Sequence, residues 1–210
     1  MTGRFITFEG CEGVGKTTQV ARAAGWLRAR GLEVVVTREP GGTPRAEALR
    51  KLLLERDGEP MPEACELLLM FAARSSHLDN LVRPALARGA WVVCDRFTDA
   101  TYAYQGGGHG VSRAFIASLE TFVHADCRPD LTILFDVPLA VSRARLARAE
   151  ANGRALDKFE SERQDFFARV RVAYLERAAA EPQRVRVVDS SRPVDDVRVE
   201  LAALLAALGQ

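Results

Sequence analysis

The sequence predicts an α/β fold with a doubly wound, five-stranded parallel sheet flanked by helices. Five short apolar runs, mostly rich in β-branched residues, have the pattern of strands buried on both faces of a sheet. Helical patterns separate the runs, and this alternation produces parallel strands joined by right-handed crossovers. Ligands of such sheets bind beyond the carboxyl ends of the strands. We therefore expect polar motifs where the strands end.

The elements follow one another without a repeat, a low-complexity tract or a linker, so residues 1–210 are expected to form a single domain. Gly31 is a common type of helix stop, Ser112 is a candidate N-cap, and Pro84 is expected to bend the longest helix. The expected strands span residues 4–8, 33–37, 90–94, 131–136 and 184–189. The expected helices span residues 16–30, 45–54, 63–88, 113–125 and 161–180, a segment starting at 138, and residues 194–208.

Composition excludes several classes of protein. The net charge is +1, whereas a dedicated nucleic-acid binder usually has a basic excess. The four cysteines and three histidines have no metal-ligand spacing, and widely spaced free thiols are typical of a reducing compartment. No apolar run is long enough for a signal peptide or a membrane span. We expect a cytoplasmic protein with neither a nucleic-acid nor a membrane partner.

Residues 10–17, GCEGVGKT, match the phosphate-binding pattern G-x-x-x-x-G-K-[ST] between an expected strand and an expected helix. Glycines let backbone N–H groups turn toward phosphate oxygens, and the helix N-terminus adds its positive dipole end. Lys16 would contact the β- and γ-phosphates, and the Thr17 hydroxyl would ligate Mg²⁺. The stretch is therefore expected to bind ATP through Gly10, Cys11, Glu12, Gly13, Val14, Gly15, Lys16, Thr17 and Thr18.

Glu12 is unusual in such a loop, because a carboxylate among donors aimed at phosphate repels the ligand. It either points away or answers a positive charge or hydroxyl of a second substrate. The variable positions of the loop contain no basic residue, so an arginine for the transferred phosphate must come from elsewhere.

Several classes of protein use this loop. A GTPase is disfavoured because the chain has no Asn-Lys-x-Asp for guanine, and a motor ATPase is usually larger. Three further stretches favour a small-molecule kinase: TREPGGT (37–43), FAARSSH (71–77) and DRFTDATYAYQGGG (95–108). With FEGCEGVGKTT and LDKFE (156–160), they make the whole chain resemble the thymidylate kinase family. The resemblance implies a P-loop nucleotide kinase fold and phosphorylation of thymidine monophosphate (dTMP) to the diphosphate by ATP and Mg²⁺, a step in dTTP biosynthesis.

The resemblance also implies roles for residues on the acceptor side, at about 38–108. Phe71 would stack on the pyrimidine, and Arg74 would donate to a carbonyl on the base edge. Tyr104 would disfavour a ribose 2′-hydroxyl. The residues expected to bind dTMP are Glu9, Arg38, Phe71, Arg74, Arg96, Thr101, Tyr104 and Gln105. Without these neighbours Phe71 reads as part of an ordinary apolar helix stripe with Leu67 and Leu68, and that reading stays open.

The same resemblance implies which residues stabilise the negative charge of the transferred phosphate. Arg38 and Arg96 would grip the acceptor phosphate, Glu12 would lie near them, and Asp95 would orient Mg²⁺ or its water shell. A lid at about 143–158 would supply the catalytic arginine, either Arg154 or Arg148, although this stretch is longer than the family leads us to expect. The expected catalytic residues are Lys16, Arg96, Asp95, Glu12, Arg154 and Arg148, with Thr17 and Asp95 at the metal and Arg192 near adenine.

Two alternatives remain at this point. One is a kinase for another pyrimidine monophosphate, and the other is a regulatory module that binds a nucleotide without transferring phosphate. The acceptor-side arginines and the lid argue against the module, because binding alone needs neither. The run 66–70 is apolar on more than one face, which indicates a deeply buried helix or a homodimer contact, and the resemblance favours the homodimer.

Overall fold

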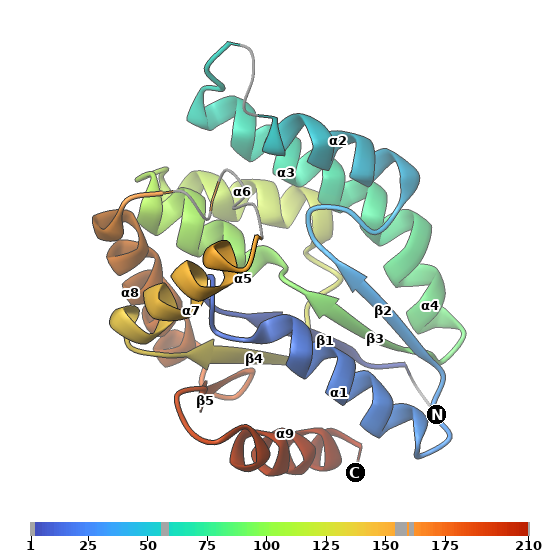
Figure 1. Cartoon of the computed structure of the whole chain (residues 1–210). Coiled ribbons are helices and arrows are strands. Elements are labelled where there is room, and N and C mark those ends of the chain that lie inside the picture. Colours follow the sequence, from blue (N-terminus) through green and yellow to red (C-terminus); the bar gives the residue numbers. More distant parts are fainter. Residues whose placement is uncertain (1–2, 56–58, 154–158, 160–161, 210) are drawn as a thin grey trace.

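The computed structural model describes residues 3–55, 59–153, 159 and 162–209. It contains a five-stranded, all-parallel sheet in the order β2-β3-β1-β4-β5, which confirms the predicted doubly wound α/β class (Figure 1). The chain order reverses beside β1, so the carboxyl end of that central strand is a topological switch point. The strands are β1 (Phe5–Glu9), β2 (Val34–Arg38), β3 (Trp91–Asp95), β4 (Leu131–Asp136) and β5 (Val185–Asp189).

The helices cover both faces of the sheet. Figure 1 shows α1 and α9 together on one side, and α2, α3, α4 and α6 gathered on the other. The α-helices are α1 (Lys16–Arg28), α2 (Pro44–Leu54), α3 (Glu63–His77), α4 (Arg83–Ala87), α5 (Thr98–Thr101), α6 (Arg113–His124), α7 (Leu139–Ala151), α8 (Gln164–Ala180) and α9 (Val194–Leu208). Two wider, π-helical segments are η1 (Leu78–Val82) and η2 (Tyr102–Gly108).

The core follows the two-residue period of the strands. In β1, Phe5 belongs to a cluster with residues of η1 and α4, whereas Ile6 and Phe8 belong to a larger cluster that includes α1 and α9. All three side chains are at most 1% exposed. Burial on both faces explains why this strand reads as a continuous apolar run.

The helix expected at 63–88 is broken into α3, η1 and α4. Pro84 has no N–H to donate, and its ring crowds the carbonyl four residues earlier. Just before the proline the backbone forms a π-helical turn, in which the Arg83 N–H donates to Leu78 O, five residues earlier. The change from α-helical to π-helical bonding therefore begins at Leu78, six residues ahead of Pro84.

The glycine run at 106–108 lies in η2 and packs closely against α8. An added Cβ at Gly107 would lie 2.5 Å from Ala173 Cβ, and one at Gly108 would lie 2.3 Å from Phe166 Cε2. These distances are far below van der Waals contact. The glycines thus permit close approach of two helices rather than free movement.

Two further observations concern the described part of the chain. None of its helices is both long and apolar enough to cross a bilayer. Its cysteines are free thiols, and no cluster of three or more His, Cys, Asp or Glu side chains within it is arranged to hold a metal ion.

Candidate active site

The phosphate loop joins the end of β1 to the start of α1, as its sequence pattern predicted. Gly10, Gly13 and Gly15 have φ angles of 134°, 73° and 90°. These values are favourable only for glycine. An added Cβ at Gly10 would lie 2.3 Å from Phe135 O. The loop is therefore shaped by backbone geometry that other residues would not tolerate.

Lys16 opens α1 and its side chain turns back over the loop. Its Nζ donates to Gly10 O at 3.0 Å and Cys11 O at 3.2 Å. Burial lowers the pKa of this ammonium, and the neighbouring Arg96 lowers it further. A phosphate within reach of Nζ would replace these backbone acceptors with charged ones. Ser142 Oγ and Ser190 Oγ brace the loop from outside by donating to Glu12 O and Val14 O, at 2.7 and 2.6 Å.

One cavity of about 520 Å³ extends from the phosphate loop to the carboxyl ends of β2 and β3. Its volume lies within the range of small-molecule sites. Its lining combines loop residues with arginines from five other segments, so it offers positive charge to more than one phosphate group. The lining residues used below are Glu12, Lys16, Thr17, Thr18, Arg38, Glu39, Arg50, Met70, Arg74, Asp95, Arg96, Thr101, Tyr104, Gln105, Arg145 and Phe159.

Arg96 follows β3 and has a φ of 71°, which is uncommon for a residue with a side chain. Its guanidinium is ion-paired with Glu12, and it donates to Gly10 O and to the Tyr104 hydroxyl, both at 3.1 Å. Glu12 therefore does not point away from the site: it meets a positive charge there. The strained backbone directs Arg96 at the phosphate loop, where a guanidinium suits phosphate oxygens.

Asp95 and Thr17 fit a magnesium ion in the presence of a nucleotide. Asp95 ends β3 opposite Phe8 of β1, and its Oδ1 is buried without a hydrogen-bond partner in the described structure. A buried carboxylate oxygen without a donor is costly unless a cation or its water reaches it. Thr17 is exposed in the first turn of α1 and lines the same cavity. Oxygen donors of this kind, completed by phosphates and water, are typical of Mg²⁺ sites.

Arg74 extends from α3 into the cavity wall and belongs to a buried hydrogen-bond network. Its Nε donates to Glu39 Oε2 at 2.7 Å and its Nη2 to Thr101 Oγ1 at 3.0 Å. The other Glu39 oxygen lies 2.9 Å from His77 Nδ1. Burial raises the pKa of the Glu39 carboxyl, but Arg74 and His77 outweigh it and hold that pKa below its usual value. The third guanidinium nitrogen, Nη1, is buried without a partner among the described residues, and a donor is thus left for a ligand.

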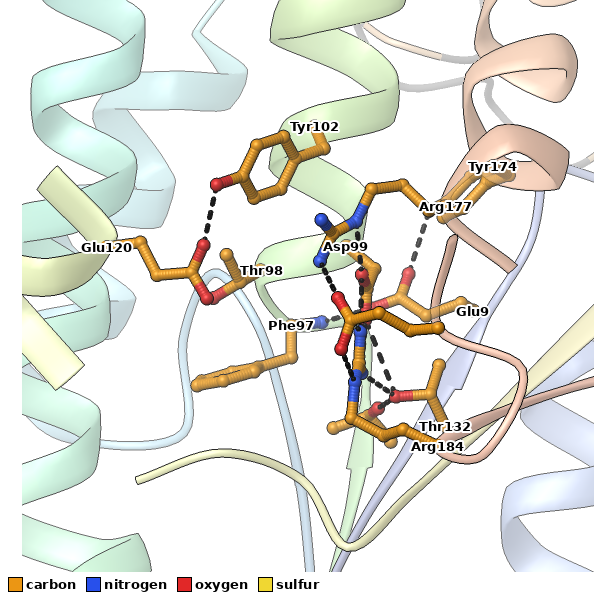
Figure 2. Close-up of polar contacts among 12 residues, drawn as sticks. Glu9, Phe97, Thr98, Asp99, Tyr102, Glu120, Thr132, Tyr174, Arg177 and Arg184 are labelled. Atoms are coloured by element: carbon orange, nitrogen blue, oxygen red, sulfur yellow. Dashed lines mark hydrogen bonds and ion pairs between the residues drawn. The ribbon is translucent and has the colours of Figure 1, made fainter. Parts of the chain in front are cut away.

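Glu9 lies behind the cavity rather than in it, which corrects its expected place in the dTMP site. It is completely buried and does not line the cavity. Its two oxygens accept from Phe97 N at 2.6 Å and from the Tyr174 hydroxyl at 2.8 Å (Figure 2). Burial, followed by repulsion from Asp99, raises its pKa to about 8. Glu9 therefore supports the segment that follows β3 from behind the cavity.

Figure 2 shows Arg177 and Arg184 converging from opposite sides on Asp99, which lies in this segment. Arg184 donates to both carboxylate oxygens, at 2.7 and 3.0 Å, and Arg177 Nε donates at 2.9 Å. Thr132 Oγ1 accepts a further bond from Arg184 at 2.6 Å. Asp99 is 3% exposed. The network ties α5, which contains Thr101, to α8 and to the start of β5.

A sequence model of the thymidylate kinase family matches residues 8–201 of the chain. The chain belongs to this family. It is 58% identical over 208 residues to a thymidylate kinase of Pseudomonas fluorescens, covering 99% of this chain and 97% of the relative. It is 57% identical over 199 residues to that of Bordetella pertussis, covering 95% and 92%. A crystal structure of thymidylate kinase from Ehrlichia chaffeensis superimposes with a TM-score of 0.77 at 33% identity, covering 98% of this chain and 99% of that one.

Most of the residues that the sequence predicted to bind ATP or dTMP lie together on the cavity wall. Phe71 does not. It is 3% exposed and belongs to a small core cluster with Leu67, Tyr102 and Ile116, while the preceding residue, Met70, lines the cavity. The reason is helix geometry: Phe71 shares the inward face with Leu67, four residues earlier, whereas Met70 is rotated toward the cavity. The apolar-stripe reading of Phe71 describes its position.

Two of the arginines expected near ATP, Arg148 and Arg192, do not line the cavity. Arg148 is exposed on α7 and does not line the cavity, and Arg192 is exposed and ion-paired with Glu200. Arg154 lies outside the described residues. On α7 it is Arg145 that lines the cavity, donating to Ser190 O at 2.9 Å and Gly13 O at 3.4 Å. Arg148 follows Arg145 by three residues, so its side chain is turned about 60° round the helix axis from that of Arg145, away from Leu146 and Ala149, which line the cavity with Arg145.

Three charged residues of the cavity lining, Glu39, Arg50 and Arg145, were not selected from the sequence. Glu39 lies in the TREPGGT stretch (37–43). The position of this acidic residue directly after Arg38, in a motif assigned to the site, could have indicated a role there. Arg50 lies on α2 and donates to Pro40 O at 2.8 Å, but a single helical arginine carries no pattern. Arg145 stood among several arginines of one amphiphilic segment, where only the helix phase distinguishes them.

Proposed function

We propose that the chain transfers the γ-phosphoryl group of ATP to the 5′-phosphate of dTMP, in the presence of Mg²⁺, and forms dTDP and ADP. Membership of the thymidylate kinase family supports the reaction class. The observation that carries the proposal is one continuous cavity, in which the phosphate loop, with Arg96 bonded to it, faces Arg38 and Arg74. A module that only holds ATP needs no arginine-lined chamber beyond the γ-phosphate.

At the donor end, loop N–H groups and the start of α1 would hold the β- and γ-phosphates, and Lys16 would leave its backbone acceptors to join them. Asp95 and Thr17 would hold Mg²⁺ or its water shell. The ion, when bound, would neutralise charge on the bridging phosphate oxygens. Arg145, already bonded to the loop and to Ser190 O, would border the nucleotide on the α7 side.

At the acceptor end, the nucleophile is a phosphate oxygen that is already anionic, so no strong general base is required. Arg96 and Arg38 would hold this phosphate in line with the γ-phosphate, and Arg96 would face both groups. Glu12 and Tyr104 orient the Arg96 guanidinium. The chain would therefore act by placing two phosphates and offsetting their charge, as phosphoryl transfer demands.

The nucleoside would occupy the chamber between Met70, Arg74, Tyr104 and Gln105. The unpartnered Nη1 of Arg74 would donate to a base carbonyl, which thymine has where cytosine has an amino group. Tyr104 is 5% exposed and its ring contacts Arg96, so the fixed ring would lie beside the sugar.

A panel assay tests this proposal. ADP release from Mg·ATP is measured with thymidine, deoxyuridine, uridine, cytidine, adenosine and guanosine monophosphates. A strong response to dTMP supports the proposal, and a larger response to another pyrimidine monophosphate moves the acceptor to that nucleotide. Tight ATP binding with no response to any acceptor would overturn the kinase reaction and leave a binding module.

We also propose a homodimer formed through α3 and α6. These helices pack on one another and expose Leu68, Phe115 and Phe122, whose side chains are 52%, 45% and 87% accessible. Exposed apolar groups on adjacent elements mark interaction surfaces. The chain is expected to be cytoplasmic, where its thiols stay reduced. Phe122→Glu is expected to shift the mass measured by light scattering from dimer to monomer. Val199→Glu on α9, 66% exposed, is the control, and a monomeric wild type would refute the dimer.

A further inference from the structure

We infer that Glu66 is a positioning residue that fixes the orientation of the Gln105 amide and so makes the chamber selective for a pyrimidine with a 4-oxo group and a hydrogen on N3. The inference rests on the proposed function, because it concerns the acceptor base of that reaction. It assigns a role to a carboxylate that lies outside the phosphate-binding machinery.

Glu66 lies in the first turn of α3 and is only 3% exposed. Its Oε1 accepts from Gln105 Nε2 at 2.9 Å, and His109 Nε2 lies 3.7 Å from the same oxygen. Gln105 comes from η2 and is 1% exposed. A carboxylate is costly to bury, so it is retained where its charge and its hydrogen bonds are both used. Here they act on the residue beside the base.

The chemistry of the two groups decides how the amide is turned. Glu66 Oε1 accepts from Gln105 Nε2, so the end of the Gln105 amide that faces Glu66 is the NH₂ group. The carbonyl oxygen, Oε1, is then on the remaining side of the amide, and Gln105 lines the cavity. A neutral apolar neighbour at position 66 would leave both orientations open, since oxygen and nitrogen have nearly the same size.

The fixed amide complements Arg74. The buried Nη1 of Arg74 is a donor without a partner among the described residues, and Gln105 Oε1 is an acceptor. Thymine and uracil present an acceptor at O4 next to a donor at N3–H, which matches this pair. Cytosine presents a donor at N4 next to an acceptor at N3, which opposes it at both atoms. Unmatched buried polar groups are the strongest source of discrimination between similar substrates.

The test compares Glu66→Met and Glu66→Gln with wild type, with Glu63→Gln as the matched control. Glu63 is exposed in the same helical turn, so its substitution removes one charge without reaching the amide. Kcat/KM and the dissociation constant are measured for dTMP, dUMP and dCMP. Methionine at position 66 fills the site without hydrogen bonding, and an amide there can donate as well as accept, so both variants release the orientation.

We expect the dTMP-to-dCMP ratio to fall about tenfold or more in Glu66→Met, and by less in Glu66→Gln. The dTMP-to-dUMP ratio stays constant, because both bases have the same edge, and Glu63→Gln leaves every ratio unchanged. If both Glu66 variants lower all three values by one common factor, or change none, Glu66 is merely structural and the inference is overturned. A wild type inactive on dTMP overturns the proposed function itself, which is a separate outcome.

Discussion

Arg184 grips both carboxylate oxygens of Asp99 beneath the nucleotide chamber, at 2.7 and 3.0 Å (Figure 2). A second arginine, Arg177, reaches the same carboxylate and also lies over the Tyr102 ring, 4.2 Å from its centre. Removing Asp99 would strand two guanidinium groups that are mostly buried. We expect Asp99→Asn to lower the free energy of unfolding by about 3 kcal/mol, measured by urea denaturation.

The matched control for that substitution is Asp126→Asn. Asp126 also pairs with an arginine, Arg83, at 2.8 Å, but its side chain is 73% exposed. A surface pair contributes at most about 1 kcal/mol. Equal losses in the two variants would show that burial does not set the strength of the Asp99 network.

Glu9→Gln is predicted to change how stability depends on pH. The pKa of Glu9 is raised to about 8 by burial and then by Asp99, so the folded state holds a proton that the unfolded state releases from about pH 4.5 upward. This term is fully present at low pH and is lost between about pH 4.5 and 8. Glutamine resembles the protonated acid and can still meet Phe97 N and Tyr174.

The variant should therefore match wild type near pH 5 and exceed it near pH 8, with the gap growing by at most about 1.4 kcal/mol per pH unit. Thermal unfolding across this pH range provides the measurement. A gap that is constant with pH would mean that Glu9 is ionised in the folded protein throughout.

Arg145→Ala and Arg148→Ala compare two arginines that lie three residues apart on α7. Only Arg145 lines the cavity and contacts the phosphate loop. We expect Arg145→Ala to raise KM for ATP about tenfold, the scale of a lost charge-assisted bond, and Arg148→Ala to leave it within about twofold. Steady-state kinetics at saturating dTMP measure both. The reverse result would assign Arg148 to the nucleotide.

Arg96→Lys is predicted to lower kcat about 100-fold or more while the protein stays folded. A lysine keeps the charge, but it loses the planar fork that meets Glu12, Gly10 O and Tyr104 together. Single-turnover rates isolate the chemical step, and circular dichroism checks the fold. A kcat close to that of wild type would leave Arg96 as a structural tether.

Met70→Ala and Phe71→Ala are expected to differ in kind. Met70 lines the cavity, so its truncation should raise KM for dTMP about tenfold with a small effect on stability. Phe71 lies in the core, so its truncation should lower the free energy of unfolding by about 3–5 kcal/mol. Kinetics and denaturation are measured on both. A large KM effect of Phe71→Ala without destabilisation would restore its predicted stacking role.

The fold was predictable because its signals are local and redundant. The strand run 131–136 and the helix 194–208 were placed at the residues that the structure shows, since β-branched runs and flanking prolines act within a few residues. The phosphate loop was predictable for the same reason. The positive φ of Gly15, where an added Cβ would meet nothing within 4 Å, is a local requirement of the backbone, so a short pattern specifies it.

The errors at the site arose where a residue's role depends on helix phase or on distant partners. Phe71 and Met70 are adjacent, and only the packing of α3 decides which of them faces the cavity. The Glu9 carboxyl meets Tyr174, which is 165 positions away in sequence. The partners of Asp99 come from α8 and from just before β5. No local pattern joins such residues, because the tertiary fold alone brings them together.

Gly107 and Gly108 press the backbone of η2 against α8. The part of η2 that contains Gln105 therefore cannot move closer to α8. A side chain added at Gly107 or Gly108 would displace it toward the cavity. The width of the chamber near the base therefore depends on the packing of η2 against α8. That packing is possible because Gly107 and Gly108 have no Cβ atom. A substitution that never touches the ligand could narrow the range of bases admitted.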